Sequence, residues 1–308
     1  MVVVVLATSL LCAEFGARLV YRDAHSSGHA GDFVAVHGGG PPIITNSLGF
    51  REREIPPKSS GRYRIAVVGD SFTWGQGIAA GERFSNLVGD FLGQDYEVLN
   101  YGIPGNNLPE HLDVLAKVLP AAPDFVLLQL YINDFEMPEM VRPRPLPLLP
   151  GALDRRLEPA SVLYDLANQQ WAGVQPELGL SDTYVGYMAR NLRDENGRHS
   201  RAAFGMLRQF IERARAAGVG VGTVLFPAPD AMGPHGTNYP FGYLHDRVRQ
   251  TCAAEAIGCL DLLPEFSTIP DPRSMWVSPL DAHPNAMANQ LASRAILRQF
   301  ASAWPHPG

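Results

Sequence analysis

A serine and a histidine far apart in the chain are of the residue types that nucleophilic catalysis requires. Ser71 follows the apolar run 65–68 and the pair Gly69-Asp70, and a helical stretch comes after it. This strand–turn–helix pattern predicts a hydroxyl at the carboxyl edge of a sheet, close to the free N–H groups of a helix start. A free hydroxyl is a poor nucleophile near neutral pH, so Ser71 needs a base.

The base can come from a segment near the C-terminal end, Asp281-Ala282-His283-Pro284-Asn285. In an extended segment the side chains of residues i and i+2 point to the same side. Asp281 can therefore bind one imidazole nitrogen of His283 while the other nitrogen faces Ser71. Proline suits the first turn of a helix, so Pro284 can start the helix that follows. Taken alone, such a segment is more often a capped turn, and only its combination with Ser71 favours catalysis.

Three groups are expected to donate hydrogen bonds to the oxyanion of an acyl-transfer reaction. One is the backbone N–H of Ser71. The second is the N–H of Gly102, which follows the second predicted strand and has no side chain to obstruct a substrate. The third is the side-chain amide of Asn133, after the third strand. Separately, Gly102 is an ordinary strand-end turn and Asn133 an Asx turn, but together they predict an oxyanion hole.

The elements that must position these groups alternate regularly from residue 64. The sequence predicts strands at 64–68, 96–101, 125–130, 219–225 and 258–262, and helices at 82–92, 107–119, 201–217, 242–256 and 285–303. Short apolar strands that alternate with helices indicate a parallel sheet that is covered on both faces.

One long connection interrupts this alternation. About seventy residues separate the third strand from the helix at 201, too many for an ordinary loop. Five prolines exclude a regular helix over 137–150, whereas 161–172 has a helical pattern. We interpret the stretch at about 135–200 as an insertion that forms a wall of the substrate cleft. The alternative is an excursion that packs on the side of the domain and contacts no ligand.

An apolar segment begins the chain. Residues 1–13 are almost wholly apolar, and Glu14 and Arg18 then interrupt the run. The run is short for a bilayer span, and it lacks the basic start and small-residue cleavage site of a signal peptide. We interpret residues 1–22 as a signal-anchor helix that leaves the protein exported and membrane-anchored, on the periplasmic or extracytoplasmic face. A buried helix packed on the domain is the alternative, and residues 23–61 are predicted to be an irregular linker.

Composition narrows the classes of function. The chain has 308 residues, of which 46% are hydrophobic, enough for one large α/β domain. Its net charge of -6 provides no basic surface, so no nucleic-acid partner is expected. Cys252 and Cys259 are seven residues apart, consistent with either a disulfide or two buried thiols. The sequence contains no Cys-x-x-Cys pattern of the kind that binds zinc, and neither a metal nor a cofactor is expected.

These residues resemble the four sequence blocks of the SGNH hydrolases, the GDSL esterase/lipase superfamily. In chain order, the blocks correspond to Gly69-Asp70-Ser71, to Gly102, to Asn133-Asp134, and to Asp281 with His283. The resemblance covers residues 62–303. It departs from the family pattern at Tyr131, where the third block usually has glycine, and in the single residue between Asp281 and His283, where two are common.

The resemblance implies a three-layer α/β/α sandwich, flavodoxin-like, with a five-stranded parallel sheet. It also implies Ser71 as the nucleophile, His283 as the base and Asp281 as the group that orients it. The oxyanion hole would consist of the Ser71 and Gly102 N–H groups and the Asn133 amide. Four aromatic side chains near this site are candidates for the substrate pocket: Phe72, Trp74, Tyr131 and Phe135.

The predicted reaction is hydrolysis of carboxylic (O-acyl) esters through an acyl-enzyme, without a metal or cofactor. It should slow at acid pH, because an imidazolium cannot act as a base. The first alternative is an O-acyltransferase or deacetylase that acts on cell-envelope polysaccharide. The second is a non-catalytic carbohydrate-binding protein on the same fold. The acyl chain, the alcohol part of the substrate and the oligomeric state are left open by the sequence.

Overall fold

The computed structural model of this protein describes residues 2–21, 43–58, 61–141, 145–158, 160–279 and 281–305. The chain forms two compact units. The first comprises Met1–Gly39 and Val141–Ala189, and the second Gly40–Met140 and Arg190–Gly308. All residues expected in the site belong to the second unit.

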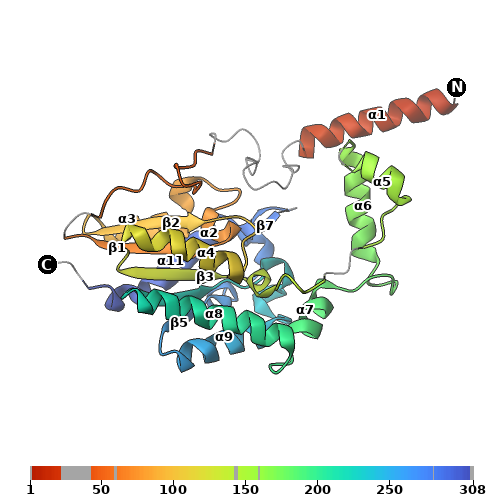
Figure 1. The fold of residues 1–308 in the computed structure, drawn as a ribbon. Coiled ribbons are helices and arrows are strands. Elements are labelled where there is room, and N and C mark those ends of the chain that lie inside the picture. The colour runs from red at the N-terminus through yellow and green to blue at the C-terminus, as the bar shows by residue number, and fades with distance from the viewer. Residues whose placement is uncertain are drawn as a thin grey trace. The chain divides into compact units, whose positions relative to one another are not determined.

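A five-stranded parallel sheet forms the centre of the second unit (Figure 1). Its strands are β1 (Tyr63–Gly69), β2 (Tyr96–Gly102), β3 (Phe125–Leu130), β4 (Gly220–Leu225) and β5 (Gly258–Asp261). Their spatial order, β2-β1-β3-β4-β5, is that of flavodoxin-like sheets. The central strands read as continuous apolar runs because both faces of the sheet are buried. The five predicted strands are therefore confirmed.

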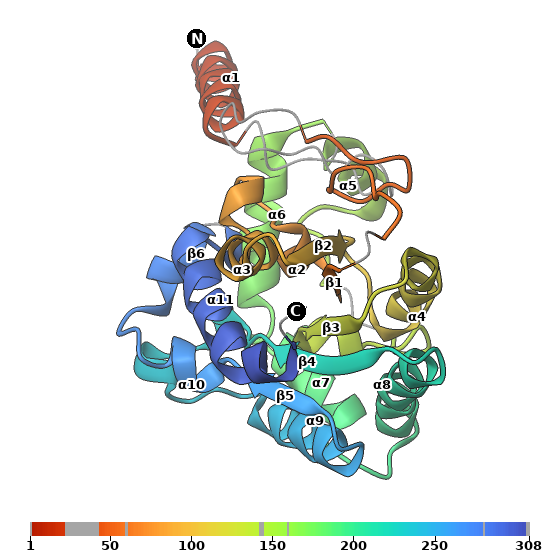
Figure 2. The ribbon, with the colours of Figure 1, turned by 90° about the vertical axis from the view of Figure 1, so that its left-hand side faces the viewer.

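Helices cover both faces of this sheet (Figure 2). On one face α3 (Phe84–Leu92) packs beside α11 (Ala286–Phe300), and the other face is covered by α4 (Leu108–Val118), α8 (Arg198–Ala216) and α9 (Gly242–Ala254). The unit is the α/β/α sandwich that the sequence predicted. The remaining short helices are α2 (Ser71–Trp74), α7 (Tyr184–Leu192) and α10 (Leu263–Phe266).

Aromatic packing fixes the last helix on the sheet. The Phe300 and Trp304 rings stack with their centroids 5.9 Å apart, and Phe125 of β3 meets Trp304 edge-on at 5.7 Å. All three side chains are buried. The Tyr96 hydroxyl also donates a hydrogen bond of 3.1 Å to the Trp304 carbonyl. Helix α11 is thereby held at its far end, which steadies the segment that precedes it.

That preceding segment is a short antiparallel hairpin that carries the expected base. It consists of β6 (Trp276–Ser278) and β7 (Asp281–Pro284). Helix α11 begins at Ala286, and the Asn285 side chain caps it by accepting the Ala288 N–H at 3.2 Å. The expectation that Pro284 starts the helix is therefore wrong, because asparagine is the stronger N-cap residue and sets the start later.

The first unit contains the N-terminal helix and the insertion, with α1 (Val2–Tyr21), α5 (Gly151–Leu157) and α6 (Val162–Val174). Glu14 of α1 accepts hydrogen bonds from the Ser161 hydroxyl at 2.7 Å and from the Val162 and Leu163 N–H groups at 3.0 Å. These N–H groups begin α6 and have no partner within that helix. The Leu163 N–H, with the other donors, lowers the pKa of Glu14 to about 2. Helix α1 is thus docked on the insertion.

No helix in the described part of the chain has both the length and the apolar character of a membrane span. On α1 the side chains of Leu10, Leu11 and Phe15 are exposed. Membrane attachment through residues 1–22 stays a prediction, as does the cleft wall. Of the expected linker 23–61, residues 23–42 and 59–60 lie outside the described residues, and 43–58 belong to the second unit.

Candidate active site

Ser71 is the first residue of the one-turn helix α2 and comes directly after β1 and Asp70. Asp70 caps the helix, because its Oδ1 accepts the Phe72 N–H at 2.9 Å. The Ser71 side chain keeps 8% of its surface exposed. A helix of one turn makes few bonds of its own, so its neighbours determine where it lies. The structure therefore places the hydroxyl at the carboxyl edge of the sheet, where it was expected.

Gln129 of β3 ties this turn to the middle of the sheet. Its Oε1 accepts the Asp70 N–H at 3.1 Å and the Thr73 hydroxyl at 2.8 Å. Both Gln129 and Thr73 are fully buried. One carboxamide oxygen thus holds residues on either side of Ser71, and the nucleophile turn cannot shift without breaking a buried hydrogen bond.

His283 lies against Ser71 although 212 positions separate them in the chain. Its Nε2 is 2.9 Å from the Ser71 Oγ, and its Nδ1 is 2.5 Å from the Asp281 Oδ1. The same carboxylate oxygen accepts the His283 backbone N–H at 3.0 Å. Asp281 and His283 both lie on β7, so the extended backbone puts their side chains on one side, as the spacing predicted. A hydroxyl that donates to such an imidazole can lose its proton to it.

An aromatic pair packs beside this hydrogen-bonded chain. The Phe72 ring meets the His283 imidazole edge-on at 5.5 Å, and the Tyr131 ring lies 4.5 Å from Phe72. Phe72 is buried and Tyr131 is half-buried. Of the four aromatic candidates for a substrate pocket, Tyr131 is the one that is partly exposed, and the other three are buried.

The other two aromatic candidates belong to the interior. Phe135 is 0% exposed and stacks on Phe204 of α8 with centroids 5.0 Å apart. Trp74 is also buried. The expectation that Phe135 and Trp74 line a pocket is wrong, because aromatic residues at a sheet edge more often fill the core between the sheet and its helices.

Asn133 lies in the 3-10 turn Ile132–Phe135, directly after β3. Asp134 closes that turn, since its Oδ2 accepts the Tyr131 N–H at 2.6 Å, and its Oδ1 is 2.9 Å from His111 Nε2. The Asn133 Oδ1 is buried and has no hydrogen-bond partner among the described residues. The turn is therefore fixed through Asp134 and not through the Asn133 carboxamide oxygen.

Gly102 differs from its expected role. Its N–H donates to the Asn100 side-chain oxygen at 3.0 Å, so this donor is already engaged. A Cβ on Gly102 would lie 2.3 Å from the Trp74 nitrogen. Glycine is needed here because the end of β2 touches the backbone of α2. The sequence analysis missed Asn100, although an asparagine two residues before a strand-end glycine is a signal for such a contact.

A second glycine in the same loop has an N–H that is available. Gly105 follows Gly102 by three residues and is exposed. No acceptor for the Gly105 N–H occurs within the residues that the structure describes, and the same holds for the N–H of Ser71. A free N–H at the carboxyl edge of the sheet is the kind of donor that an oxyanion requires.

Three ionisable side chains are buried beneath the nucleophile turn: Asp70, His111 and Asp134. Burial, together with the charge of the nearby Asp134 carboxylate, raises the pKa of Asp70 to about 7. Burial opposes a charge on His111, but the hydrogen bond and charge of Asp134 outweigh it and raise the His111 pKa. Near neutral pH these groups therefore hold more protons than they would in water.

The two cysteines left open by the sequence are free thiols in this structure. Cys252 of α9 is buried, with its Sγ 3.2 Å from the Thr223 hydroxyl, and Cys259 is half-buried. Across the described ranges, no group of three or more His, Cys, Asp or Glu residues is placed to hold a metal ion.

One protein-family model matches most of this chain. The model of the GDSL-like Lipase/Acylhydrolase family matches residues 67–291. Among solved structures, TesA is 17% identical, covering 78% of this chain and 98% of its own, with a TM-score of 0.48. A lipolytic G-D-S-L protein from Veillonella parvula is 15% identical, with coverages of 78% and 98% and a TM-score of 0.47. Axe2, an acetylxylan esterase from Geobacillus stearothermophilus, is 17% identical, with coverages of 77% and 93% and a TM-score of 0.46.

Among curated proteins no sequence matches this chain. The family match spans most of the chain, and it contains the blocks around Ser71, Gly102, Asn133 and His283. This match confirms the resemblance seen in the sequence. Members of this family cleave ester bonds. The chain belongs to the GDSL-like lipase/acylhydrolase family, the SGNH hydrolases, and is a carboxylic ester hydrolase.

Proposed function

We propose that this protein hydrolyses carboxylic esters in two steps, with Ser71 as nucleophile, His283 as general base and Asp281 as its orienting group. The observation that carries the proposal is the continuous hydrogen-bonded chain from Ser71 Oγ through His283 to Asp281, with contacts of 2.9 and 2.5 Å. The same constellation of hydroxyl, imidazole and carboxylate serves acyl transfer on unrelated folds.

In the first step, His283 Nε2 takes the hydroxyl proton of Ser71 as Oγ attacks the ester carbonyl carbon. The carbonyl π electrons move onto oxygen and give a tetrahedral oxyanion. When the intermediate collapses, the bond from carbon to the alcohol oxygen breaks, and His283 returns the proton to the departing alkoxide. An alcohol leaves, and the acyl group stays on Ser71.

In the second step, His283 takes a proton from water, and the hydroxide attacks the acyl carbon of the acyl-enzyme. The carbon–Oγ bond then breaks, and the proton on His283 returns to Ser71. Asp281 keeps Nδ1 protonated throughout, so Nε2 remains the nitrogen that accepts and donates. The products are the carboxylic acid and the free enzyme.

For the oxyanion we propose three donors: the Ser71 N–H, the Asn133 carboxamide and the Gly105 N–H. Gly105 replaces Gly102 because the Gly102 N–H is bound to Asn100. Tyr131 is the aromatic side chain that we place next to the acyl group, on the basis of its partial exposure and its packing against Phe72. Each donor of this kind is worth on the order of a hundredfold or more in rate.

The test is the Ser71→Ala variant assayed on short p-nitrophenyl esters. We expect kcat to fall on the order of ten-thousand-fold or more, because the variant has no nucleophile. Labelling by a fluorophosphonate probe should also vanish. Ser302→Ala, which removes an exposed hydroxyl near the C-terminus, serves as the control. Ester hydrolysis or probe labelling that persists in Ser71→Ala would show that another residue is the nucleophile.

A further inference from the structure

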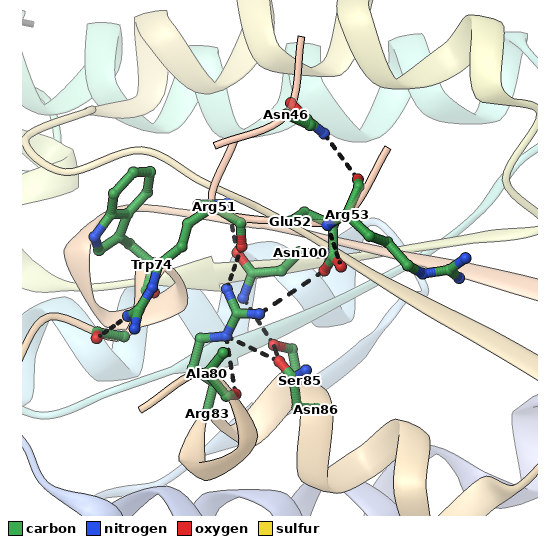
Figure 3. A network of polar contacts seen from close by, with 12 residues as sticks. Asn46, Arg51, Glu52, Arg53, Trp74, Ala80, Arg83, Ser85, Asn86 and Asn100 are labelled. Carbon is green, nitrogen blue, oxygen red and sulfur yellow. Dashed lines mark hydrogen bonds and ion pairs between the residues drawn. The ribbon is translucent and has the colours of Figure 1, made fainter. Parts of the chain in front are cut away.

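The nucleophile helix α2 is held at its C-terminal end by a residue from outside the stretch that matches the family. Arg51 Nη1 donates to the Trp74 carbonyl at 3.2 Å and to the Gly75 carbonyl at 2.7 Å (Figure 3). Its Nη2 donates to the Ile78 carbonyl at 2.9 Å. The family match begins at residue 67. One guanidinium group thus binds three backbone carbonyls immediately after Ser71.

The choice of arginine has a physical reason. The last carbonyls of a helix have no partner within the helix, and they form its negative end. A guanidinium presents five N–H groups in a fixed plane and stays charged, so it can donate to several carbonyls at once. A lysine ammonium carries the same charge but lacks this rigid fork. Arg51 therefore both satisfies and orients the end of a helix that is too short to hold itself.

Arg51 is itself anchored by the residues on either side of it. Phe50 is 0% exposed and packs edge-on against Tyr101 of β2 at 4.9 Å. Glu52 accepts the Asn100 backbone N–H at 3.0 Å through its Oε2. The Arg83 guanidinium, only 2% exposed, donates to the Arg51 carbonyl. Residues 50–52 are therefore held against the edge strand β2, and Figure 3 shows Arg51 and Glu52 beside Arg83 and Asn100.

Asn100 completes the same arrangement from β2. Its Nδ2 donates to the Thr73 carbonyl at 2.6 Å and to the Ser85 hydroxyl at 2.7 Å. The carbonyls of Thr73, Trp74 and Gly75 are consequently all bound from outside the helix. Ser71 begins this turn, so a shift of its C-terminal end carries the nucleophile with it. A misplacement of about 1 Å at a reacting atom can cost on the order of a hundredfold in rate.

We propose that Arg51 is a positioning residue for the reaction, which fixes α2 so that Ser71 Oγ stays within hydrogen-bond distance of His283. The inference rests on the proposed function, since it assumes Ser71 as nucleophile. It also means that residues 43–58 are a working part of the hydrolase unit. They are not merely a linker that leads from the N-terminal helix to the first strand.

The experiment compares Arg51→Gln, Arg51→Lys, Arg51→Ala and Arg53→Gln in the full chain. Arg53 is the matched control because it is two residues away, is 52% exposed and pairs with Glu97 without contacting α2. For each variant, the concentration of reactive sites is titrated with a fluorophosphonate. The kcat and KM for p-nitrophenyl acetate are then expressed per titrated site, and the melting temperature is recorded.

We expect Arg51→Gln to lower kcat per titrated site by about ten- to a hundredfold, with KM within about twofold of the wild type. Arg51→Lys keeps the charge and should fold, yet it should lose about tenfold in kcat because it lacks the fork. In Arg51→Ala, guanidinium ion well below its denaturing concentration should restore part of the rate. Arg53→Gln should stay within twofold of the wild type.

A purely structural role gives a different pattern. The melting temperature and the titrated fraction would fall, while kcat per titrated site in both Arg51→Gln and Arg51→Lys stayed within twofold of the wild type. That result would overturn the proposal. Failure of the proposed function itself is recognised separately, because it appears as activity that persists in Ser71→Ala.

Discussion

Two histidine–aspartate pairs lie near Ser71. They contain the same two residue types but differ in their position in the fold and in their exposure to solvent. His283 and Asp281 form a contact of 2.5 Å on a hairpin strand, and the His283 side chain is 25% exposed. His111 and Asp134 form a contact of 2.9 Å between α4 and the turn after β3, and both side chains are 0% exposed. The first pair faces solvent at the edge of the sheet, and the second is buried below it.

The second imidazole nitrogen shows what this difference means. His283 Nε2 faces the Ser71 hydroxyl, so a proton can pass between them. His111 Nδ1 has no hydrogen-bond partner among the described residues, and no hydroxyl contacts it there. The carboxylate of Asp134 also holds the turn that carries Asn133. The proposed catalytic role of a histidine–aspartate pair therefore depends on what its second ring nitrogen contacts, and a pair whose second nitrogen contacts no hydroxyl can only hold the structure.

A third pair, His245 with Asp261, sharpens this conclusion. Asp261 Oδ1 lies 2.8 Å from His245 Nδ1, and the Tyr239 hydroxyl lies 3.0 Å from His245 Nε2. By residue type, this is a hydroxyl–imidazole–carboxylate chain like that of Ser71, His283 and Asp281. However, the Tyr239 hydroxyl also accepts the Ala228 N–H at 2.9 Å, and His245 is 1% exposed. Every partner in this chain is used to brace a loop, so it provides no reactive site.

The largest expected effect separates the first and third pairs. His283→Gln should lower kcat by about ten-thousand-fold, because no base remains for Ser71. His245→Gln is the matched control. It should lower the melting temperature while leaving kcat per titrated site within about twofold. Steady-state kinetics makes the measurement, expressed per mole of folded protein for His283→Gln and per titrated site for His245→Gln. Equal losses of kcat in both variants would contradict the division between catalytic and structural pairs.

A smaller effect is expected at the buried pair. His111→Leu leaves the Asp134 carboxylate buried without its partner, which should cost about 3–5 kcal/mol of unfolding free energy. The turn that carries Asn133 then loosens, and we expect kcat to fall about tenfold, far less than in His283→Gln. His111→Gln, whose amide can still donate to Asp134, should recover part of both losses. Denaturant unfolding and kinetics test this prediction. A loss of kcat as large as that of His283→Gln, without loss of stability, would make His111 part of the chemistry.

The sequence predicted the contact between Asp281 and His283 and missed the two buried pairs for a simple reason. Asp281 and His283 are two residues apart, so the period of an extended strand suffices to bring them together. His111 and Asp134 are 23 residues apart, and His245 and Asp261 are 16 apart. Their pairing depends on how helices dock against the sheet, which local pattern does not contain. The strands were predictable because buried parallel strands are continuous apolar runs.

The donors were harder to predict than the nucleophile. Gly102 ends β2 and Gly105 follows it by three residues, and spacing alone could not decide which N–H remains free. The choice depends on the Asn100 side chain and on the close approach of α2 to Gly102. Arg51 was missed because residues 43–58 have the irregular pattern of a linker. Its role follows only from where that segment lies on the sheet edge.

The smallest expected effect concerns Asp70, the buried carboxyl group that caps the nucleophile helix. Burial raises its pKa in the folded protein to about 7, above the value of 3.8 for an unperturbed aspartate. The folded state therefore binds the proton more tightly than the unfolded state does. The resulting contribution to stability is fully present below about pH 4 and is lost as the pH rises through about 7.

Asp70→Asn removes this titration while keeping an oxygen for the Phe72 N–H, and it places an N–H₂ group where the partnerless Oδ2 lies. Relative to the wild type, the variant should gain on the order of 2 kcal/mol in unfolding free energy between pH 5 and pH 8. Denaturant titrations at the two pH values measure the gain, and Asp90→Asn, which removes an exposed carboxylate, controls for net charge. A difference between Asp70→Asn and wild type that is the same at both pH values would mean that Asp70 is already ionised at pH 5. In that case His111 would have to be protonated at pH 5, because the neighbouring Asp70 and Asp134 carboxylates cannot both stay charged in the interior without a positive charge beside them.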